Sequence, residues 1–261
     1  MARKDSKIAI EGLSKTFLSD GRELTALKDL SMEARGGELL GLVGPSGCGK
    51  TTLLNLIAGL EEPTQGTILI GGKRVEGPGF DRGMMFQEGA LLPWRTVLKN
   101  VEFGLEIKGV DPREREKIAE GYLKLVGLEG FETNYPHELS GGMMQRAALA
   151  RGLTYDPDIL LMDEPFASVD ALTRENLQNE LLRIWRETKK TIVFVTHSID
   201  EAVYLSDRVA VMTARPGKIK EVLEIDLPRP RSGVRASPKF AKYRSEVWGI
   251  LKTEVGGSDE F

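Results

Sequence analysis

A glycine-rich segment has the residue types of a loop that binds phosphate, and it reads Gly44-Pro45-Ser46-Gly47-Cys48-Gly49-Lys50-Thr51, followed by Thr52. Its glycines would let backbone N–H groups wrap phosphate oxygens, Lys50 would reach the β- and γ-phosphates, and the Thr51 hydroxyl would bind Mg²⁺. An apolar run at 39–43 precedes the segment and a 3.6-residue apolar period follows from Lys50. A strand and a helix are therefore expected on its two sides, which favours a phosphate loop over an ordinary glycine-rich turn. Cys48 is interpreted as a spacer in this loop and not as a redox group.

A second segment suited to an anion reads Leu139-Ser140-Gly141-Gly142. Ser140 is a good N-cap for a helix through Leu149, and the N-terminus of a helix attracts negative charge. The chain thus carries two segments that are suited to phosphate. One nucleotide does not need both from one subunit, which suggests that two copies work together.

Two adjacent carboxylates, Asp163 and Glu164, end the apolar run Ile159–Met162. Asp163 suits direct or second-sphere contact with Mg²⁺, and Glu164 could polarise an attacking water. Because neighbouring side chains of a strand point to opposite faces, the two are not expected to do the same job. A solvated acidic turn is the alternative, and the phosphate loop upstream favours the functional interpretation.

Gln87 and His197 each follow a short apolar strand, at 84–86 and 191–195. Open α/β sheets bind ligands at the carboxyl ends of their strands, which gives His197 a functional position. An amide at Gln87 could reach metal or water, but composition alone does not distinguish it from an ordinary loop glutamine.

The arrangement of strands and helices predicts an α/β protein. An early strand is expected around Ile8–Leu13, and a hairpin is expected around Gly71-Gly72. Residues 96–155 are interpreted as a helical insertion, with Asp111 starting one of its helices. Asp170 is expected to cap a helix, and Ser198 and Glu201 have capping-box spacing. From 228 to 239 a proline-containing basic linker is expected, before an amphipathic run at 240–252.

Composition limits the class of protein. The chain has 261 residues, 41% of them hydrophobic, and a formal net charge of −3, which gives no electrostatic reason to expect nucleic acid as a partner. Cys48 is the single cysteine, so a reducing compartment is expected. No signal peptide or bilayer-spanning stretch is seen, so the chain is expected to be soluble alone.

With these segments together, the chain resembles the ATP-binding subunits of ABC transporters over residues 8–225. Six segments in the family's order carry the resemblance: the loop at 44–51, Gln87, the Leu-Ser-Gly-Gly at 139–142, Asp163-Glu164, the loop 167–170 and His197. The resemblance implies a P-loop NTPase (RecA-like) core with an antiparallel β subdomain and an inserted α-helical subdomain. Its expected boundaries are 1–95 and 156–225 for the core and β subdomain, 96–155 for the helical subdomain, and 226–261 for a linker and C-terminal helix.

The resemblance also implies a role for each motif residue. Two copies would pack head to tail, so that Ser140, Gly141 and Gly142 of one contact the γ-phosphate of ATP held by the P-loop of the other. Phe17 would stack on adenine, although an aromatic that simply packs on an edge strand is the alternative. Glu164 would be the general base, and Asp170 would lie at the dimer interface. His197 would hold the γ-phosphate, and Gln87 would join Thr51 and Asp163 around Mg²⁺.

The partners implied are a second copy of the chain, transmembrane permease subunits and, indirectly, a solute-binding protein, at the cytoplasmic face of the cell membrane. Two departures from the family pattern, Met143 for glutamine and Ser168-Val169 in the interface loop, remove no group that contacts phosphate. The stretches Phe86–Trp94 and Ile225–Arg231 resemble the importer branch for nitrate, sulfonates and taurine.

Several alternatives remain at the level of sequence. Related ATPases serve importers for pyrimidine precursors, and an exporter or lipid-handling ATPase is a near competitor. An ABC ATPase acting on nucleic acid or ribosomes would usually carry two cassettes or a long coiled-coil insertion, and neither appears. A P-loop kinase or GTPase would have no reason to carry the segment 139–146.

Overall fold

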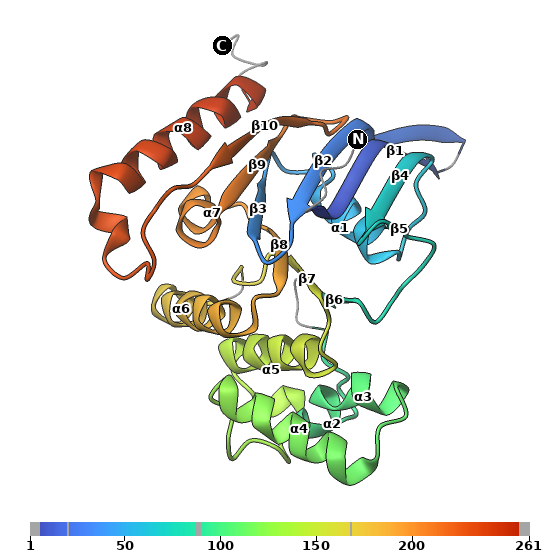
Figure 1. Cartoon of the computed structure of the whole chain (residues 1–261), viewed down its shortest axis with the longest axis vertical. Coiled ribbons are helices and arrows are strands. Elements are labelled where there is room, and N and C mark those ends of the chain that lie inside the picture. Colours follow the sequence, from blue (N-terminus) through green and yellow to red (C-terminus); the bar gives the residue numbers. More distant parts are fainter. Residues whose placement is uncertain (1–5, 20, 87–89, 168, 256–261) are drawn as a thin grey trace. The chain divides into compact units, whose positions relative to one another are not determined.

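The computed structural model describes residues 6–19, 21–86, 90–167 and 169–255. They belong to two compact units, one drawn from residues 1–79 and 189–261 and the other from residues 80–188. Each unit has its own strands and helices (Figure 1).

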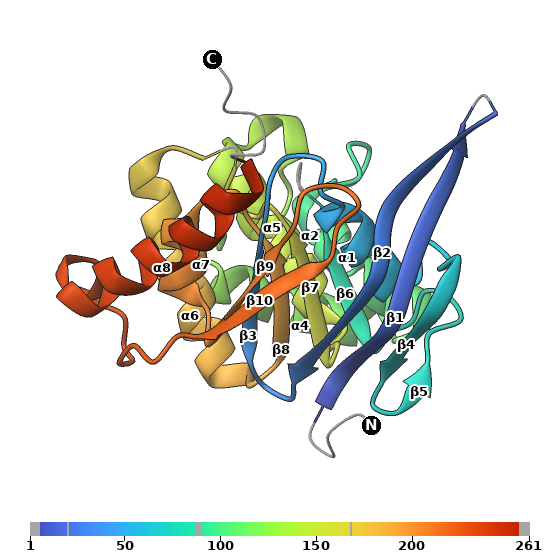
Figure 2. The same cartoon turned by 90° about the horizontal axis from the view of Figure 1, so that it is seen from above.

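An antiparallel sheet in the first unit has the strand order β2-β1-β4-β5. The strands are β1 (Ser6–Ser19), β2 (Arg22–Arg35), β4 (Gln65–Ile70) and β5 (Lys73–Arg74). Figure 2 shows β1 and β2 as a long pair. The hairpin expected at Gly71-Gly72 is present, with Ile70 opposite Lys73. The early strand is present too, and is longer than its apolar positions indicate.

A second group of strands forms the core of the first unit. The parallel strands β3 (Leu39–Val43), β8 (Thr191–Val195) and β9 (Arg208–Met212) lie in the order β9-β3-β8, and β10 (Ile219–Glu224) pairs antiparallel with β9. Every residue of β3, β8 and β9 is buried, as in parallel sheets covered on both faces.

The described residues of the first unit also form three α-helices. They are α1 (Lys50–Ala58), α7 (Ile199–Leu205) and α8 (Pro238–Val255), with a 3₁₀ turn, η2, at Val234–Ala236. Helix α7 packs on β3 and β9, and α8 packs on α7 and β9. The predicted helix start at Lys50 is confirmed.

The proline-containing segment before α8 lies against the carboxyl end of α7. Arg229 Nη2 donates to the Leu205 carbonyl at 2.9 Å, and Arg231 Nη2 donates to the Ser206 carbonyl at 2.7 Å. Burial lowers the pKa of Arg231 to about 10, with a further contribution from Arg229. Cations at the end of a helix also suit its dipole, so both arginines help to dock this segment.

The second unit combines two parallel strands with a helical layer. The strands are β6 (Arg82–Met85) and β7 (Ile159–Asp163), and the helical elements are α2 (Val97–Val101), α3 (Phe103–Ile107), α4 (Pro112–Leu125), η1 (Pro136–Glu138), α5 (Gly141–Thr154) and α6 (Ala171–Thr188). Helix α5 packs against α2, α3 and α4. Asp111 caps α4 as predicted, accepting a hydrogen bond from Arg113 N at 3.0 Å. Helix α5 ends later than the expected Leu149, because Ala150 and Leu153 continue its buried face.

No helix in the described residues is both long enough and apolar enough to span a bilayer.

Candidate functional site

The glycine-rich loop Gly44–Thr51 connects β3 to α1, as the sequence predicts. The N-cap residue of α1 is Gly49, and no side chain caps this helix. The N–H groups of its first turn are therefore not occupied by a capping side chain. A helix start of this kind binds phosphate through its backbone and its dipole.

Lys50 is folded over the loop from which it projects. Its ammonium donates to the carbonyls of Gly44 and Pro45 at 2.8 and 2.9 Å and lies 3.7 Å from the Cys48 sulfur. The Lys50 residue is only 5% exposed. A buried ammonium that is bonded to neutral carbonyls is stabilised further when an anion binds next to it. The loop is therefore electrostatically suited to phosphate.

Cys48 is a packing residue of this loop. Its side chain is fully buried, and burial raises the pKa of its thiol although Lys50 acts in the opposite direction. A thiol with a raised pKa is a poor nucleophile at neutral pH, which agrees with its interpretation as a spacer.

The first unit brings His197 to the same sheet edge as the phosphate loop. Strands β3 and β8 are parallel neighbours, with Leu42 opposite Val195, so both chains leave the sheet at the same edge. Thr196 N donates to the Leu42 carbonyl at 3.2 Å, and the next residue, His197, is exposed. This is the edge at which open α/β sheets bind ligands.

The start of α7 fixes the backbone just after His197. Ser198 Oγ accepts from Glu201 N at 3.3 Å, as its spacing predicts. Ser198 N donates to the Thr196 hydroxyl, and this hydroxyl donates to the buried Glu201 carboxylate at 2.5 Å. The Thr196 hydroxyl thus links the Glu201 carboxylate to the Ser198 N–H, an arrangement that the capping-box pattern does not indicate.

Phe17 lies on β1 and is half-buried. The Lys15 ammonium is 4.8 Å from its ring centroid and also pairs with Glu61 at 2.8 Å. A partly exposed aromatic ring is compatible with stacking on a base, and the adenine role of Phe17 stays a prediction.

In the second unit, Asp163 and Glu164 stand at the carboxyl end of β7. Asp163 is the last residue of the strand, and Glu164 follows it with a left-handed backbone, φ 49°. The expected alternation of their side chains does not apply, because Glu164 lies outside the strand. Asp163 is 5% exposed and Glu164 is 9% exposed, so this is not the solvated acidic turn of the alternative.

Ser140 caps α5 as the sequence predicts, accepting from Met143 N at 3.3 Å, and it is exposed. Gly142 is the second residue of the same helix and is buried. A Cβ at Gly142 would lie 2.6 Å from Thr173 Cγ2 on α6, so close helix packing requires this glycine.

Asp170 is exposed and caps α6, accepting from the backbone N–H groups of Leu172 and Thr173 at 3.1 Å each. The hydrogen bond from the Thr173 side chain is the largest contribution that lowers the pKa of Asp170. Sequence reasoning missed Arg174, whose guanidinium donates to the carbonyls of Phe166 and Val169 at 3.2 and 2.8 Å. Its position four residues after Asp170, one helical turn beyond the cap, could have indicated that it folds back onto this loop.

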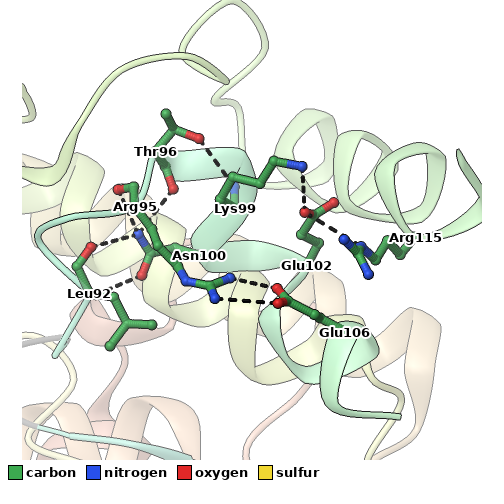
Figure 3. A network of polar contacts seen from close by, with 8 residues as sticks. All are labelled: Leu92, Arg95, Thr96, Lys99, Asn100, Glu102, Glu106 and Arg115. Atoms are coloured by element: carbon green, nitrogen blue, oxygen red, sulfur yellow. Dashed lines mark hydrogen bonds and ion pairs between the residues drawn. The ribbon is translucent and has the colours of Figure 1, made fainter. Parts of the chain in front are cut away.

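The second unit also positions the described part of the stretch that resembles the importer branch. Asn100 is fully buried, accepts from Leu92 N at 2.7 Å, and donates to the carbonyls of Leu92, Arg95 and Thr96 (Figure 3). Trp94, between these anchors, is 72% exposed. Gln87 lies outside the described residues.

Among the described residues, no group of three or more His, Cys, Asp or Glu side chains could hold a metal ion. The described residues therefore do not indicate a site in which protein side chains alone surround a metal ion. The predicted donors fit Mg²⁺, which usually takes one or two protein oxygens and completes its shell with water and phosphate.

Comparison with known proteins places the chain in a family. Residues 27–167 match the model of the ABC transporter family. The chain is 58% identical to an uncharacterized ABC transporter ATP-binding protein of Methanocaldococcus jannaschii, over 97% of this chain and 94% of the relative. It is 47% identical to a taurine import ATP-binding protein of Pelagibacter ubique, over 92% and 93% of the two chains. It is 46% identical to an aliphatic sulfonates import ATP-binding protein of Bacillus cereus, over 96% and 97%.

A solved structure of an ATP-binding cassette, a dimer in a post-hydrolysis state with ADP and Pi, superimposes with a TM-score of 0.76 at 32% identity. It covers 85% of this chain and 100% of that one. The expected fold class is confirmed by this likeness and by the strands and helices of both units. The chain belongs to the ABC transporter family, as an ATP-hydrolysing, ATP-binding subunit.

Proposed function

We propose that this chain energises an ABC importer for a small anionic or zwitterionic solute, with sulfonates and taurine first and nitrate next. The buried ammonium of Lys50, folded over the loop at the start of an uncapped helix, is the observation that carries the nucleotide site. The two import relatives, named for taurine and for aliphatic sulfonates, support the class of solute.

ATP is held at its phosphates by Gly44–Thr52 and at its base by Phe17. Lys50 exchanges its bonds to the loop carbonyls for the β- and γ-phosphate oxygens, which are stronger acceptors. Thr51, Gln87 and Asp163 are the oxygen donors for Mg²⁺, which neutralises phosphate charge when bound. The exposed hydroxyl of Thr51 and the nearly buried carboxylate of Asp163 support this donor set.

Glu164 is the general base that takes a proton from the attacking water, and His197 contacts the γ-phosphate. Glu164 is nearly buried and follows the last residue of β7 directly, which supports a role at the end of this strand beside Asp163. A carboxylate within hydrogen-bond reach of a bound water can accept its proton as that water attacks.

The functional unit is a head-to-tail dimer in which Ser140, Gly141 and Gly142 contact the partner's γ-phosphate and Asp170 lies at the interface. The dimeric state named for the solved cassette supports this arrangement. The dimer works with transmembrane permease subunits, and through them with a solute-binding protein, at the cytoplasmic face of the membrane. Trp94 is exposed, and the segment that contains it is held by hydrogen bonds to Asn100. Trp94 is therefore a candidate contact for the permease.

Glu164→Gln tests the catalytic role. The substitution removes the base but keeps the size of the side chain, so ATP should bind with unchanged affinity while hydrolysis falls at least about 100-fold. Steady-state hydrolysis and equilibrium binding of a fluorescent ATP analogue measure the two effects. Glu187→Gln, on an exposed part of α6, is the matched control and should hydrolyse ATP at the wild-type rate. Hydrolysis retained in Glu164→Gln would remove Glu164 from the mechanism.

The solute is tested with the complete transporter. The chain is purified with its permease, and ATP hydrolysis is measured with binding proteins loaded with taurine, an alkanesulfonate, nitrate or a pyrimidine precursor. We expect the greatest stimulation with a sulfonate. Stimulation by the pyrimidine precursor alone would contradict the proposed solute while leaving the ATPase role intact.

A further inference from the structure

A tight turn between β9 and β10 packs on the phosphate loop. Thr213 N donates to the Lys218 carbonyl, and Lys218 N donates to the Thr213 hydroxyl, both at 3.0 Å, which closes the turn. A further bond from Gly217 N to the Ala26 carbonyl at 2.8 Å ties the turn to β2. The turn is therefore a fixed support and not a loose connection.

Two consecutive carbonyls of the phosphate loop face this turn. Arg215 Nε donates to the Gly47 carbonyl at 3.1 Å. Gly217 packs so closely on the next carbonyl that a Cβ there would lie 2.0 Å from the Cys48 oxygen. In a planar trans peptide the N–H points opposite to the C=O. Holding these two carbonyls therefore directs the N–H groups of Cys48 and Gly49 away from the turn.

The same turn is attached to the C-terminal end of α8. Glu254 accepts from Ala214 N at 3.1 Å and forms an ion pair with Lys220, the second residue of β10. Lys220 also donates to the Thr253 hydroxyl at 2.5 Å. Figure 1 shows α8 beside β9 and β10. A continuous path of bonds thus runs from Glu254 through the turn and Arg215 to the Gly47 carbonyl.

We propose that Arg215 is a positioning residue for the phosphate loop, and that Glu254 of α8 sets the position of Arg215 through the turn 213–218. The inference rests on the proposed role of Gly44–Thr51 in holding ATP. When the turn is in place, the Cys48 carbonyl is held and the Gly49 N–H is presented to phosphate at no further cost in ordering, while the Cys48 N–H closes the loop on the Pro45 carbonyl at 3.3 Å. When α8 is displaced, the loop loses this support and ATP binds less tightly, so α8 is a point from which nucleotide affinity can be regulated.

The test measures nucleotide affinity and steady-state kinetics on the full chain. Arg215→Ala should weaken binding of a fluorescent ATP analogue about three- to tenfold, because it removes one exposed charge-assisted hydrogen bond. The KM for ATP should rise by the same factor with kcat nearly unchanged. Arg215→Lys keeps a charged donor and should restore most of the affinity. A purely structural role would lower the melting temperature without this change in KM.

The path from α8 is tested by a double-mutant cycle. Glu254→Ala should weaken binding in the same direction, and Arg215→Ala/Glu254→Ala should bind no more weakly than Arg215→Ala alone, since Glu254 acts through the turn. Lys239→Ala is the matched control, because it breaks the ion pair with Asp226 at the other end of α8 and should leave affinity unchanged.

Lys50→Ala separates failure of this inference from failure of the proposed nucleotide site. If Lys50→Ala abolishes binding while Arg215→Ala leaves it unchanged, the positioning role is wrong and the site stands. If Lys50→Ala also binds normally, the proposed site itself is wrong. Strictly additive effects of Arg215→Ala and Glu254→Ala would overturn the connection to α8.

Discussion

Gly142 is subject to two physical constraints, one from the proposed phosphate contact and one from helix packing. It belongs to the segment proposed to face a partner's phosphate, and its missing side chain also lets α5 approach Thr173 on α6. A substitution at Gly142 that abolishes activity does not by itself distinguish the two. The Thr173 methyl group offers a way to separate them.

Gly142→Ala should destabilise the chain by about 1–3 kcal/mol, because the new methyl group overpacks against Thr173 Cγ2. Thr173→Ser removes that atom and keeps the hydroxyl, so Gly142→Ala/Thr173→Ser should recover most of the lost melting temperature. ATP hydrolysis is then measured at the restored stability. If Thr173→Ser gives no recovery of stability, the packing explanation is wrong.

At the scale of residues, the helix starts and caps around the candidate site were predicted from the sequence, but the backbone geometry of Glu164 was not. The strand and helix around Lys50 and the capping roles of Ser140 and Asp170 are present as predicted. The left-handed backbone of Glu164 could not be predicted, because glutamate seldom adopts it and only the surrounding fold imposes it.

At the scale of elements, a single buried amide holds the chain before α2. The Asn100 side chain hydrogen-bonds to four backbone groups of Leu92, Arg95 and Thr96, and Arg95 pairs with Glu106 at 2.5 Å beside it (Figure 3). This network gives the exposed Trp94 a defined position on the second unit.

Asn100→Ala should lower the free energy of unfolding by about 1–3 kcal/mol, since it takes the hydrogen bonds of a fully buried amide away from the Leu92 N–H and the Arg95 carbonyl. The Leu92 and Thr96 carbonyls keep the backbone donors Arg95 N and Asn100 N. Denaturant unfolding measures this cost. Asn100→Asp is the matched variant: it keeps the acceptor for Leu92 N but loses the donors to three carbonyls, so it should also be destabilised. Wild-type stability in both variants would contradict the anchoring role.

Some strands could be predicted from the sequence and others could not, for physical reasons. Short apolar runs bounded by turns, such as β3 and β8, were predicted at the bounds that the structure shows. Strand β2 was not found, because bulges in its pairing with β1 break the alternation that marks a strand. Strand β10 was also missed, since it is a sheet edge with half of its residues exposed. The boundaries proposed for the subdomains stay predictions.

At the scale of the whole molecule, the two segments proposed to bind phosphate lie one in each compact unit. The phosphate loop belongs to the first, and the segment capped by Ser140 belongs to the second. We propose that these two segments act on different nucleotides, and that a second copy of the chain completes each site. In the proposed arrangement the dimer is the smallest active form.

The most direct measurement mixes two inactive chains and counts trapped ATP. Both carry Glu164→Gln to stop turnover; one adds Lys50→Ala, and the other adds Gly141→Asp, which places a carboxylate at a helix start where it suits the helix but repels phosphate. A mixed dimer has one site with an intact Lys50 and an intact Gly141. The account predicts that neither chain alone retains ATP, whereas the mixture retains one ATP per mixed dimer. A mixture that retains no more ATP than either chain alone would contradict the shared site.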